Sequence, residues 1–185
     1  YVLRGTGSAD YWRYNPLDSS WQALGAPPAT INRGASLSYK DGYFYTPRGD
    51  SNNFYRYEVA TNLWSTLPNI PAPTVSYSSH NSDIMGNFLY YNLDYGSTAF
   101  YRFDLGTTTW STLPGLPQPA YYVGAVAVGD TNTGHIYVFR GNGSYDFWKY
   151  NPRTNAFEGS VDIPVAPSTG ADLLYDGNYL YMTRG

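Results

Sequence analysis

Residues 54–68 read Phe-Tyr-Arg-Tyr-Glu-Val-Ala-Thr-Asn-Leu-Trp-Ser-Thr-Leu-Pro, and the pattern inside this stretch decides the fold. Two aromatics, a basic residue and another aromatic come first, and Trp64 follows Tyr57, the last of these aromatics, by seven positions. The pattern also begins at residues 11, 100 and 147, so its copies lie 43, 46 and 47 residues apart. In those copies the aromatic seven positions later is Trp21, Trp110 or Phe157. An offset kept in four copies indicates an internal repeat.

Each repeat also carries the signals of four short strands. A proline closes the connection after the Trp position, and a short apolar or alternating run then predicts a strand. These runs are 35–39, 125–128, 171–175 and the more polar 77–81. After a turn, the expected aromatic strands are 43–45, 88–91, 136–139 and 179–182. Asp41-Gly42 is a hairpin signal, because type I′ turns need positive φ. Four antiparallel strands in about 45 residues are typical of one propeller blade.

The composition agrees with an all-β protein built from such blades. Aromatics make up 18% of the 185 residues and charged residues only 14%, which argues against disorder and against a coiled coil. A single blade exposes two apolar faces that neighbouring blades must cover, which explains the aromatic content. The residues expected to pack between blades are Trp12, Tyr14, Trp21, Tyr55, Tyr57, Trp64, Tyr101, Phe103, Trp110, Trp148, Tyr150 and Phe157.

The repeat resembles the kelch family. Kelch blades carry an aromatic and a Trp separated by six residues, as in Tyr14 to Trp21, Tyr57 to Trp64 and Phe103 to Trp110. Where kelch blades have a Gly pair after the second strand, this chain has Arg-Gly, or Leu93-Asp94 in one repeat. The resemblance implies an all-β propeller of four kelch-like four-stranded blades in a single domain, residues 1–185. The repeats would span approximately 4–47, 48–92, 93–139 and 140–183.

The two ends of the chain repeat the same strand. Tyr1-Val2-Leu3-Arg4-Gly5 matches residues 137–141 and 181–185, so the chain starts and ends at the second strand of a blade. A closed four-bladed ring has room for only one of the two end copies. We expect the other, residues 1–5 or 181–185, to be displaced and to pair with another subunit as an assembly strand. The alternative is that the chain is an excerpt of a longer repeat protein.

No catalytic or metal site is expected. Kelch-like copper-radical oxidases need a Cys-linked Tyr and His ligands, but this chain has no Cys, and its only His residues, His80 and His135, occupy different phases of the repeat. Residues 130–134 resemble the start of a calcium loop but lack the later Glu, so a lengthened turn is the preferred reading. We therefore expect a non-enzymatic protein with no cofactor.

Arginine recurs at the exit of the second strand, at Arg4, Arg48, Arg140 and Arg184. These side chains are candidates for anion or partner contacts, although stacking on Tyr or pairing with a local Asp is favoured. Asn142 lies in the single glycosylation sequon. With a net charge of -3, the chain lacks the excess of basic residues that nucleic-acid binding needs. No apolar run approaches the roughly 20 residues of a membrane helix.

The favoured function is that of a structural or interaction propeller, extracellular or on the cell surface. Its expected partner is another copy, in a head-to-tail filament or ring-completing oligomer, or else another protein. The alternative is a glycan- or ligand-binding propeller domain of a larger secreted or surface protein. Glycan binding needs aromatic platforms in loops, whereas most aromatics here recur in expected strands, so this reading ranks second.

Overall fold

The structure, a computed structural model, describes residues 1–71, 81–93, 96–120, 127–141, 143–159, 161–168 and 171–185. These residues form seventeen strands in five small antiparallel sheets, and none of them lies in a helix. Accordingly, the described part of the chain has no helix that could span a membrane. The all-β prediction is confirmed.

The sheets follow one another along the chain. The first contains β1 (Val2–Leu3), β2 (Tyr11–Asn15) and β3 (Ser20–Ala23). The second contains β4 (Ser38–Lys40), β5 (Tyr43–Pro47), β6 (Phe54–Glu58) and β7 (Leu63–Leu67). The third contains β8 (Asn81–Met85), β9 (Phe88–Asn92), β10 (Phe100–Asp104) and β11 (Thr109–Thr112). The fourth contains β12 (Ala127–Asp130), β13 (His135–Phe139), β14 (Phe147–Asn151) and β15 (Ala156–Glu158). The fifth contains β16 (Asp172–Tyr175) and β17 (Leu180–Thr183).

The seven-position offset of the repeat is a pairing across two strands. Tyr57 lies directly opposite Trp64, and the same register recurs in the first, third and fourth sheets. The turn between these strands ends on a residue with positive φ in every copy, namely Ser19, Asn62, Thr108 and Asn155. Asn62 and Asn155 also accept a hydrogen bond from the Tyr hydroxyl five residues earlier. The repeated turn therefore sets the offset at seven.

The hairpin expected at Asp41-Gly42 is present, and both residues have positive φ, as a type I′ turn requires. Of the strand expected at 77–81, only residue 81 lies in the described part of the chain, where it begins β8 (Asn81–Met85). The polar residues of β8 bond to neighbouring sheets. Ser82 lies 2.8 Å from the Ser38 hydroxyl, and an Asp83 carboxylate oxygen accepts a hydrogen bond from the Gly129 amide at 2.9 Å.

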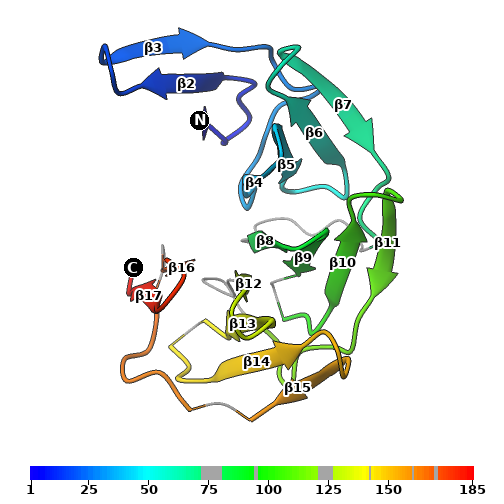
Figure 1. Ribbon diagram of the computed structural model, residues 1–185, viewed down its shortest axis with the longest axis vertical. Coiled ribbons are helices and arrows are strands. Elements are labelled where there is room, and N and C mark those ends of the chain that lie inside the picture. The colour runs from blue at the N-terminus through cyan, green and yellow to red at the C-terminus, as the bar shows by residue number, and fades with distance from the viewer. Residues whose placement is uncertain (72–80, 94–95, 121–126, 142, 160, 169–170) are drawn as a thin grey trace.

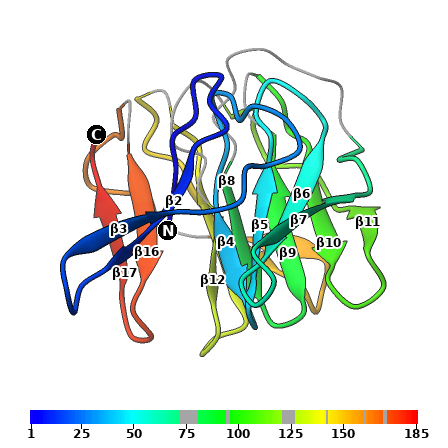
Figure 2. The ribbon, with the colours of Figure 1, turned by 90° about the horizontal axis from the view of Figure 1, so that it is seen from above.

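The five sheets are arranged as an open arc (Figure 1). Their first strands β4, β8, β12 and β16 lie on the inner side, where each packs against the next. Seen from above, β4, β8 and β12 run side by side, and the first and fifth sheets both lie to the left of them (Figure 2). The structure does not close the ring.

One packing rule joins the first four sheets. We call the four aromatics that open the repeat pattern the leading aromatics: Tyr11, Phe54, Phe100 and Phe147. Phe54 packs against Phe103 and Trp110 of the next sheet, with ring centroids 5.0 and 5.1 Å apart. Tyr11 packs in the same way against Tyr57 and Trp64, at 4.7 and 5.1 Å. Phe100 packs against Tyr150 and Phe157, at 5.1 and 5.8 Å. Each leading aromatic thus fills a place on the sheet that follows.

Two expectations differ from the structure. Three sheets are complete with four strands, whereas the first has three and the fifth has two, so four full four-stranded units are not observed. The segment of residues 1–5 is not displaced, because Val2 and Leu3 form β1 beside β2. Among the described residues, the fifth sheet ends in β17, whose outer edge is unpaired because β17 pairs only with β16.

The buried tyrosines make stability depend on alkaline pH. Burial raises the pKa of Tyr11, Tyr57 and Tyr90, and that of Tyr150 to about 12. An unfolded tyrosine has a pKa of about 10. Because the folded chain keeps these phenols neutral, their contribution to stability is complete below about pH 10 and is lost as the pH rises toward 12.

We therefore expect the free energy of unfolding, measured by urea melts, to fall above about pH 10 by up to ~1.4 kcal/mol per pH unit for each such tyrosine. Tyr150→Phe should show a shallower fall, because it removes one ionising group. A stability that stays constant up to pH 12, or an unchanged slope in the variant, would contradict this account.

Candidate functional site

The free face of the first sheet forms one end of the arc and exposes aromatic side chains. Tyr14 is 44% exposed and Trp21 56%, whereas Tyr57, the residue equivalent to Tyr14 in the second sheet, is 1% exposed. Trp12 is also exposed. These three side chains were expected to pack between sheets, but no sheet covers this face in the described part of the chain. Tyr14 and Trp21 contact each other, with ring centroids 5.0 Å apart.

The other predicted packing residues lie within the arc. Tyr55, Tyr57, Tyr101, Phe103 and Tyr150 are buried. Trp64, Trp110, Trp148 and Phe157 are half-buried. The exposed aromatics therefore belong to the first sheet, at an end of the arc, and not to the repeat position as such.

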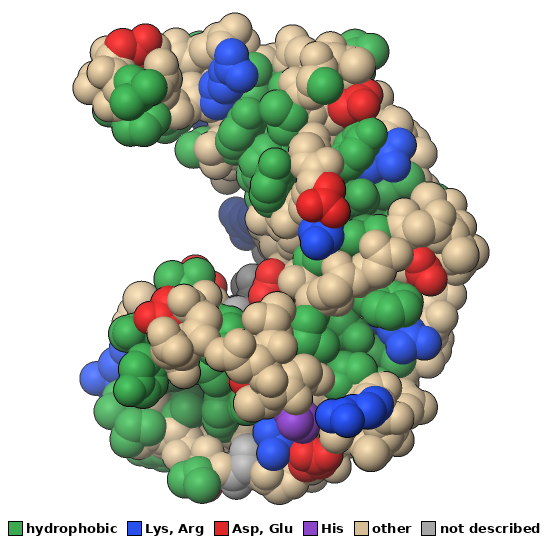
Figure 3. All heavy atoms as spheres, viewed as in Figure 1, with side chains coloured by type: hydrophobic (Ala, Val, Ile, Leu, Met, Phe, Trp, Pro, Cys, Tyr) green, Lys and Arg blue, Asp and Glu red, His purple; other side chains and the backbone are tan. Residues whose placement is uncertain are grey.

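Two hollows lie beside the first sheet. One of about 390 Å³ is lined by Tyr1, Arg13, Tyr14 and Gln22, among others. Another of about 460 Å³ is lined by residues 1–6 and 31–37. The space-filling view shows the arc open on one side, with both ends of the arc bordering the opening (Figure 3). Tyr1 and Tyr14 are the aromatic residues that line these two hollows.

The fifth sheet forms the other end. Leu174, Tyr179 and Tyr181 are exposed there, while Leu173 on the opposite face is buried against the fourth sheet. Phe147 is only half-buried and stacks on Tyr137 of its own sheet, at 5.5 Å between ring centroids. The other three leading aromatics are at most 1% exposed, because each lies against the following sheet. Phe147 lacks this contact, since the two strands that would supply it are missing from the fifth sheet.

A hydrogen bond from the Trp indole to a backbone carbonyl after the preceding sheet recurs at two junctions. The Trp64 indole Nε1–H donates to the Gly25 carbonyl at 2.7 Å, and the Trp110 indole donates to the Pro68 carbonyl at 2.9 Å. Each acceptor lies four residues after the aromatic at the Trp position of the preceding sheet. By the same rule, the acceptor for Trp21 would be the carbonyl of Val161, an exposed residue after the fourth sheet.

The recurring arginines pair locally. Arg4 binds the Asp10 carboxylate at 2.9 Å, Arg140 binds Asp146 at 3.0 Å, and Arg48 donates to the side-chain oxygen of Asn53. In all three cases the acceptor directly precedes the leading aromatic. The Arg4 hydrogen bond, followed by one from Ser8, lowers the pKa of Asp10. The guanidinium of the exposed Arg184 has no partner among the described residues.

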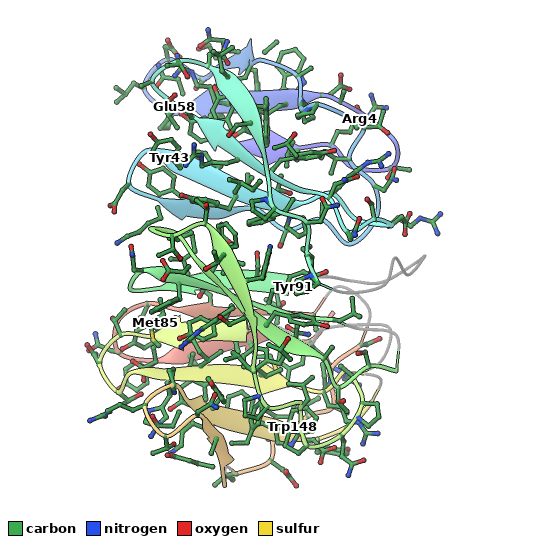
Figure 4. The ribbon with its side chains drawn as sticks, turned by 90° about the vertical axis from the view of Figure 1, so that its right-hand side faces the viewer. Arg4, Tyr43, Glu58, Met85, Tyr91 and Trp148 are labelled. Carbon is green, nitrogen blue, oxygen red and sulfur yellow. The ribbon has the colours of Figure 1, made fainter. Side chains whose placement is uncertain are left out.

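These arginines lie away from the turns that follow the leading aromatics. In Figure 4, Arg4 is at the rim opposite Tyr43 and Glu58, whose side chains are hydrogen-bonded at 3.0 Å. The Arg-Gly pair places Gly5, Gly49, Gly141 and Gly185 at positive φ. Asp94, which belongs to the repeat with Leu93-Asp94 in place of Arg-Gly, lies outside the described residues. The arginines therefore close the ends of their own sheets, with Arg184 as the exception.

Several ionisable groups of the described residues form local hydrogen bonds and ion pairs. Burial raises the pKa of Asp83, although its carboxylate accepts hydrogen bonds from the Gly129 and Ile84 amides. His135 and Lys149 both lie beside Glu158, at 3.3 and 3.1 Å. Within the described ranges, no group of three or more His, Asp or Glu side chains is placed to hold a metal. His80 and Asn142 lie outside those ranges.

Residues 130–134 form a closed turn between β12 and β13. Burial alone would raise the pKa of Asp130, but hydrogen bonds from Thr133 and Tyr175 outweigh burial and lower it. The Asp130 oxygens also accept hydrogen bonds from the Asn132 and Thr133 amides within the turn. With its carboxylate used in this way, the segment has the contacts of a structural turn.

No protein-family model matches the chain, and no curated protein matches it. The sequence had pointed to Arg4 and to residues 1–5, but not to Phe147 or Asp10 as parts of an end surface. Their positions in the repeat could have identified them, because Phe147 is the last leading aromatic and Asp10 directly precedes the first one.

Proposed function

We propose that the chain is a kelch-like propeller segment that works as a non-enzymatic structural module, extracellular or on the cell surface, and self-associates head to tail. The observation that carries the proposal is the match between the ends. The first sheet exposes Tyr14 and Trp21. At the inner junctions, the leading aromatic of the preceding sheet packs against the two residues equivalent to these. The fourth sheet presents Phe147, a half-buried leading aromatic that has no such aromatic pair to pack against among the described residues.

A second copy supplies what each end lacks. Three strands at one end and two at the other are both short of the four strands found in the complete sheets. Exposed apolar surface and an unpaired strand edge favour association, since water satisfies neither as well as another sheet does. Because the surfaces at the two ends differ, the contact is heterologous, and repetition gives a ring or a filament.

Light scattering of the 185-residue chain over a range of concentrations tests this proposal. We expect the mean mass to rise above one chain as the concentration increases. Trp21→Glu should keep the chain monomeric, because it places a charge on the first-sheet surface. Leu63→Glu is the matched control, since Leu63 is also exposed but lies on β7 within the arc, and it should associate like the unmodified chain. A compact monomer at every concentration would contradict the proposal.

The alternative of a glycan- or ligand-binding module has one observation in its favour. Tyr14 and Trp21 form an exposed aromatic pair beside the smaller hollow. The same pair is the repeat position that other sheets cover with a neighbour, and for this reason we prefer association.

A further inference from the structure

The place beside β2 is occupied in this structure by β1, the other copy of the strand that ends the chain. Val2 lies opposite Trp12, and Leu3 lies opposite Tyr11. In the fourth sheet the equivalent pairs are Val138 with Trp148 and Phe139 with Phe147. Aligned by their shared Arg-Gly, the two end copies put Met182 at the position of Val2 and Thr183 at the position of Leu3.

β1 is held in its place by few contacts. It is two residues long, and Val2 is exposed. The Tyr1 ring lies 4.4 Å from that of Phe44 and 5.9 Å from that of Tyr11, and Leu3 is half-buried against the same cluster. Arg4 forms an exposed ion pair with Asp10. Exposed ion pairs contribute little to stability, because solvent screens them. β1 is therefore the shortest strand of the first sheet, with two residues beside the five of β2 and the four of β3.

β17 carries counterparts of Tyr1 and Arg4, while Thr183 stands at the position of Leu3. Tyr181 corresponds to Tyr1 and is exposed, and Arg184 corresponds to Arg4 and lacks a carboxylate partner in the described structure. β17 is four residues long, and its outer edge is unpaired. It therefore has the residues, in register, to take the place of β1 beside β2.

We propose that β1 is an exchangeable plug and that β17 of a second copy displaces it. In the resulting sheet β16 and β17 of one copy continue into β2 and β3 of the other, giving the four strands of a complete sheet. Arg184 then binds Asp10 of the other copy, and Tyr181 takes the place of Tyr1 on Phe44. Phe147 lies next to this composite sheet and reaches Tyr14 and Trp21. This inference rests on the proposed head-to-tail association and names the strand exchange by which it occurs.

A disulfide across the β1–β2 pair would keep β1, the plug, in its position beside β2. Val2→Cys/Trp12→Cys places two thiols at directly opposed positions, which is within the Cα separation that disulfides span. The chain has no other Cys, so the bridge is unique. We expect the oxidised variant to stay monomeric in sedimentation velocity runs, and the same sample to associate again after reduction.

Removing the plug is the opposite test. Deleting residues 1–5 should tighten association by about tenfold or more, because a site that is free only part of the time weakens the apparent affinity by that fraction. Val2→Pro, which removes a backbone donor but keeps Tyr1 in the chain, should act in the same direction if the deletion destabilises the first sheet. Circular dichroism melts identify such destabilisation.

The outcomes separate the two proposals. If the oxidised variant associates as well as the reduced one, the plug is wrong, while head-to-tail association stands. If the intact chain is monomeric but the chain without residues 1–5 associates, the plug is supported, and association of the intact chain is contradicted. If the deletion and Val2→Pro both leave association unchanged or weaker with the fold intact, the strand exchange is overturned.

Discussion

Trp64→Ala is expected to lower the free energy of unfolding by ~3 kcal/mol, the lower end of the range observed when large buried aromatics are truncated, because Trp64 is half-buried. The Trp64 indole packs against Tyr11 of the first sheet and Tyr57 of its own, with ring centroids 5.1 and 5.2 Å away. The substitution also removes the hydrogen bond to the Gly25 carbonyl. Both losses occur at one junction, so urea melts should report a large effect.

Trp21→Ala is the matched control for Trp64→Ala. Trp21 occupies the same position of the repeat but is 56% exposed, because no sheet of the described chain covers it. We expect a change below about 1 kcal/mol at a protein concentration that keeps the chain monomeric. Equal losses in the two variants would show that repeat position, and not the neighbouring sheet, determines the contribution of this residue.

Gly49→Ala is the second substitution with a large expected effect, about 3–5 kcal/mol. Gly49 has a φ of 75°, where a side chain is strained. A Cβ at this position would lie only 2.1 Å from the Arg33 carbonyl oxygen, which is backbone and cannot rotate away. The required shift would disturb the backbone hydrogen bond from the Asn32 amide to the Arg48 carbonyl. This bond joins the segment around Arg33 to the segment around Gly49.

Gly5→Ala separates the clash from the backbone strain. Gly5 has a similar φ of 68°, but the nearest atom to an added Cβ is the Asn32 carbonyl oxygen at 3.7 Å, an ordinary contact. We expect a cost of about 1–2 kcal/mol from the left-handed backbone alone. Thermal melts followed by circular dichroism should therefore rank Gly49→Ala well below Gly5→Ala. The same melting temperature for both would contradict the clash.

Local patterns in the sequence predict most of the sheets. The Tyr57–Trp64 offset predicts a cross-strand pair, because the turn between them has a fixed length. Asp41-Gly42 predicts the hairpin, because both residues tolerate positive φ. The strand expected at 77–81 reaches β8 only at its first residue, and the remaining polar residues of β8 form hydrogen bonds with neighbouring sheets, as Asp83 does with Gly129. Such contacts leave no apolar alternation to follow.

The candidate site was predicted only in part. The duplicated strand at residues 1–5 and 181–185 is visible as a sequence match. The exposure of Tyr14 and Trp21 is not, since the sequence pattern is the same whether or not a sheet covers them. Burial of a repeat residue depends on its neighbour in space, and the residue alone does not encode that neighbour.

The most direct test of head-to-tail association is a mixing experiment with two blocked variants. Trp21→Glu blocks the first-sheet end, and Tyr181→Glu, at another exposed aromatic, blocks the fifth-sheet end. Each variant retains one intact end, so each alone should be monomeric in sedimentation velocity. Their equimolar mixture should form a dimer of one chain of each kind and nothing larger, because only one productive contact remains. A mixture that stays monomeric while the unmodified chain associates would contradict the head-to-tail contact.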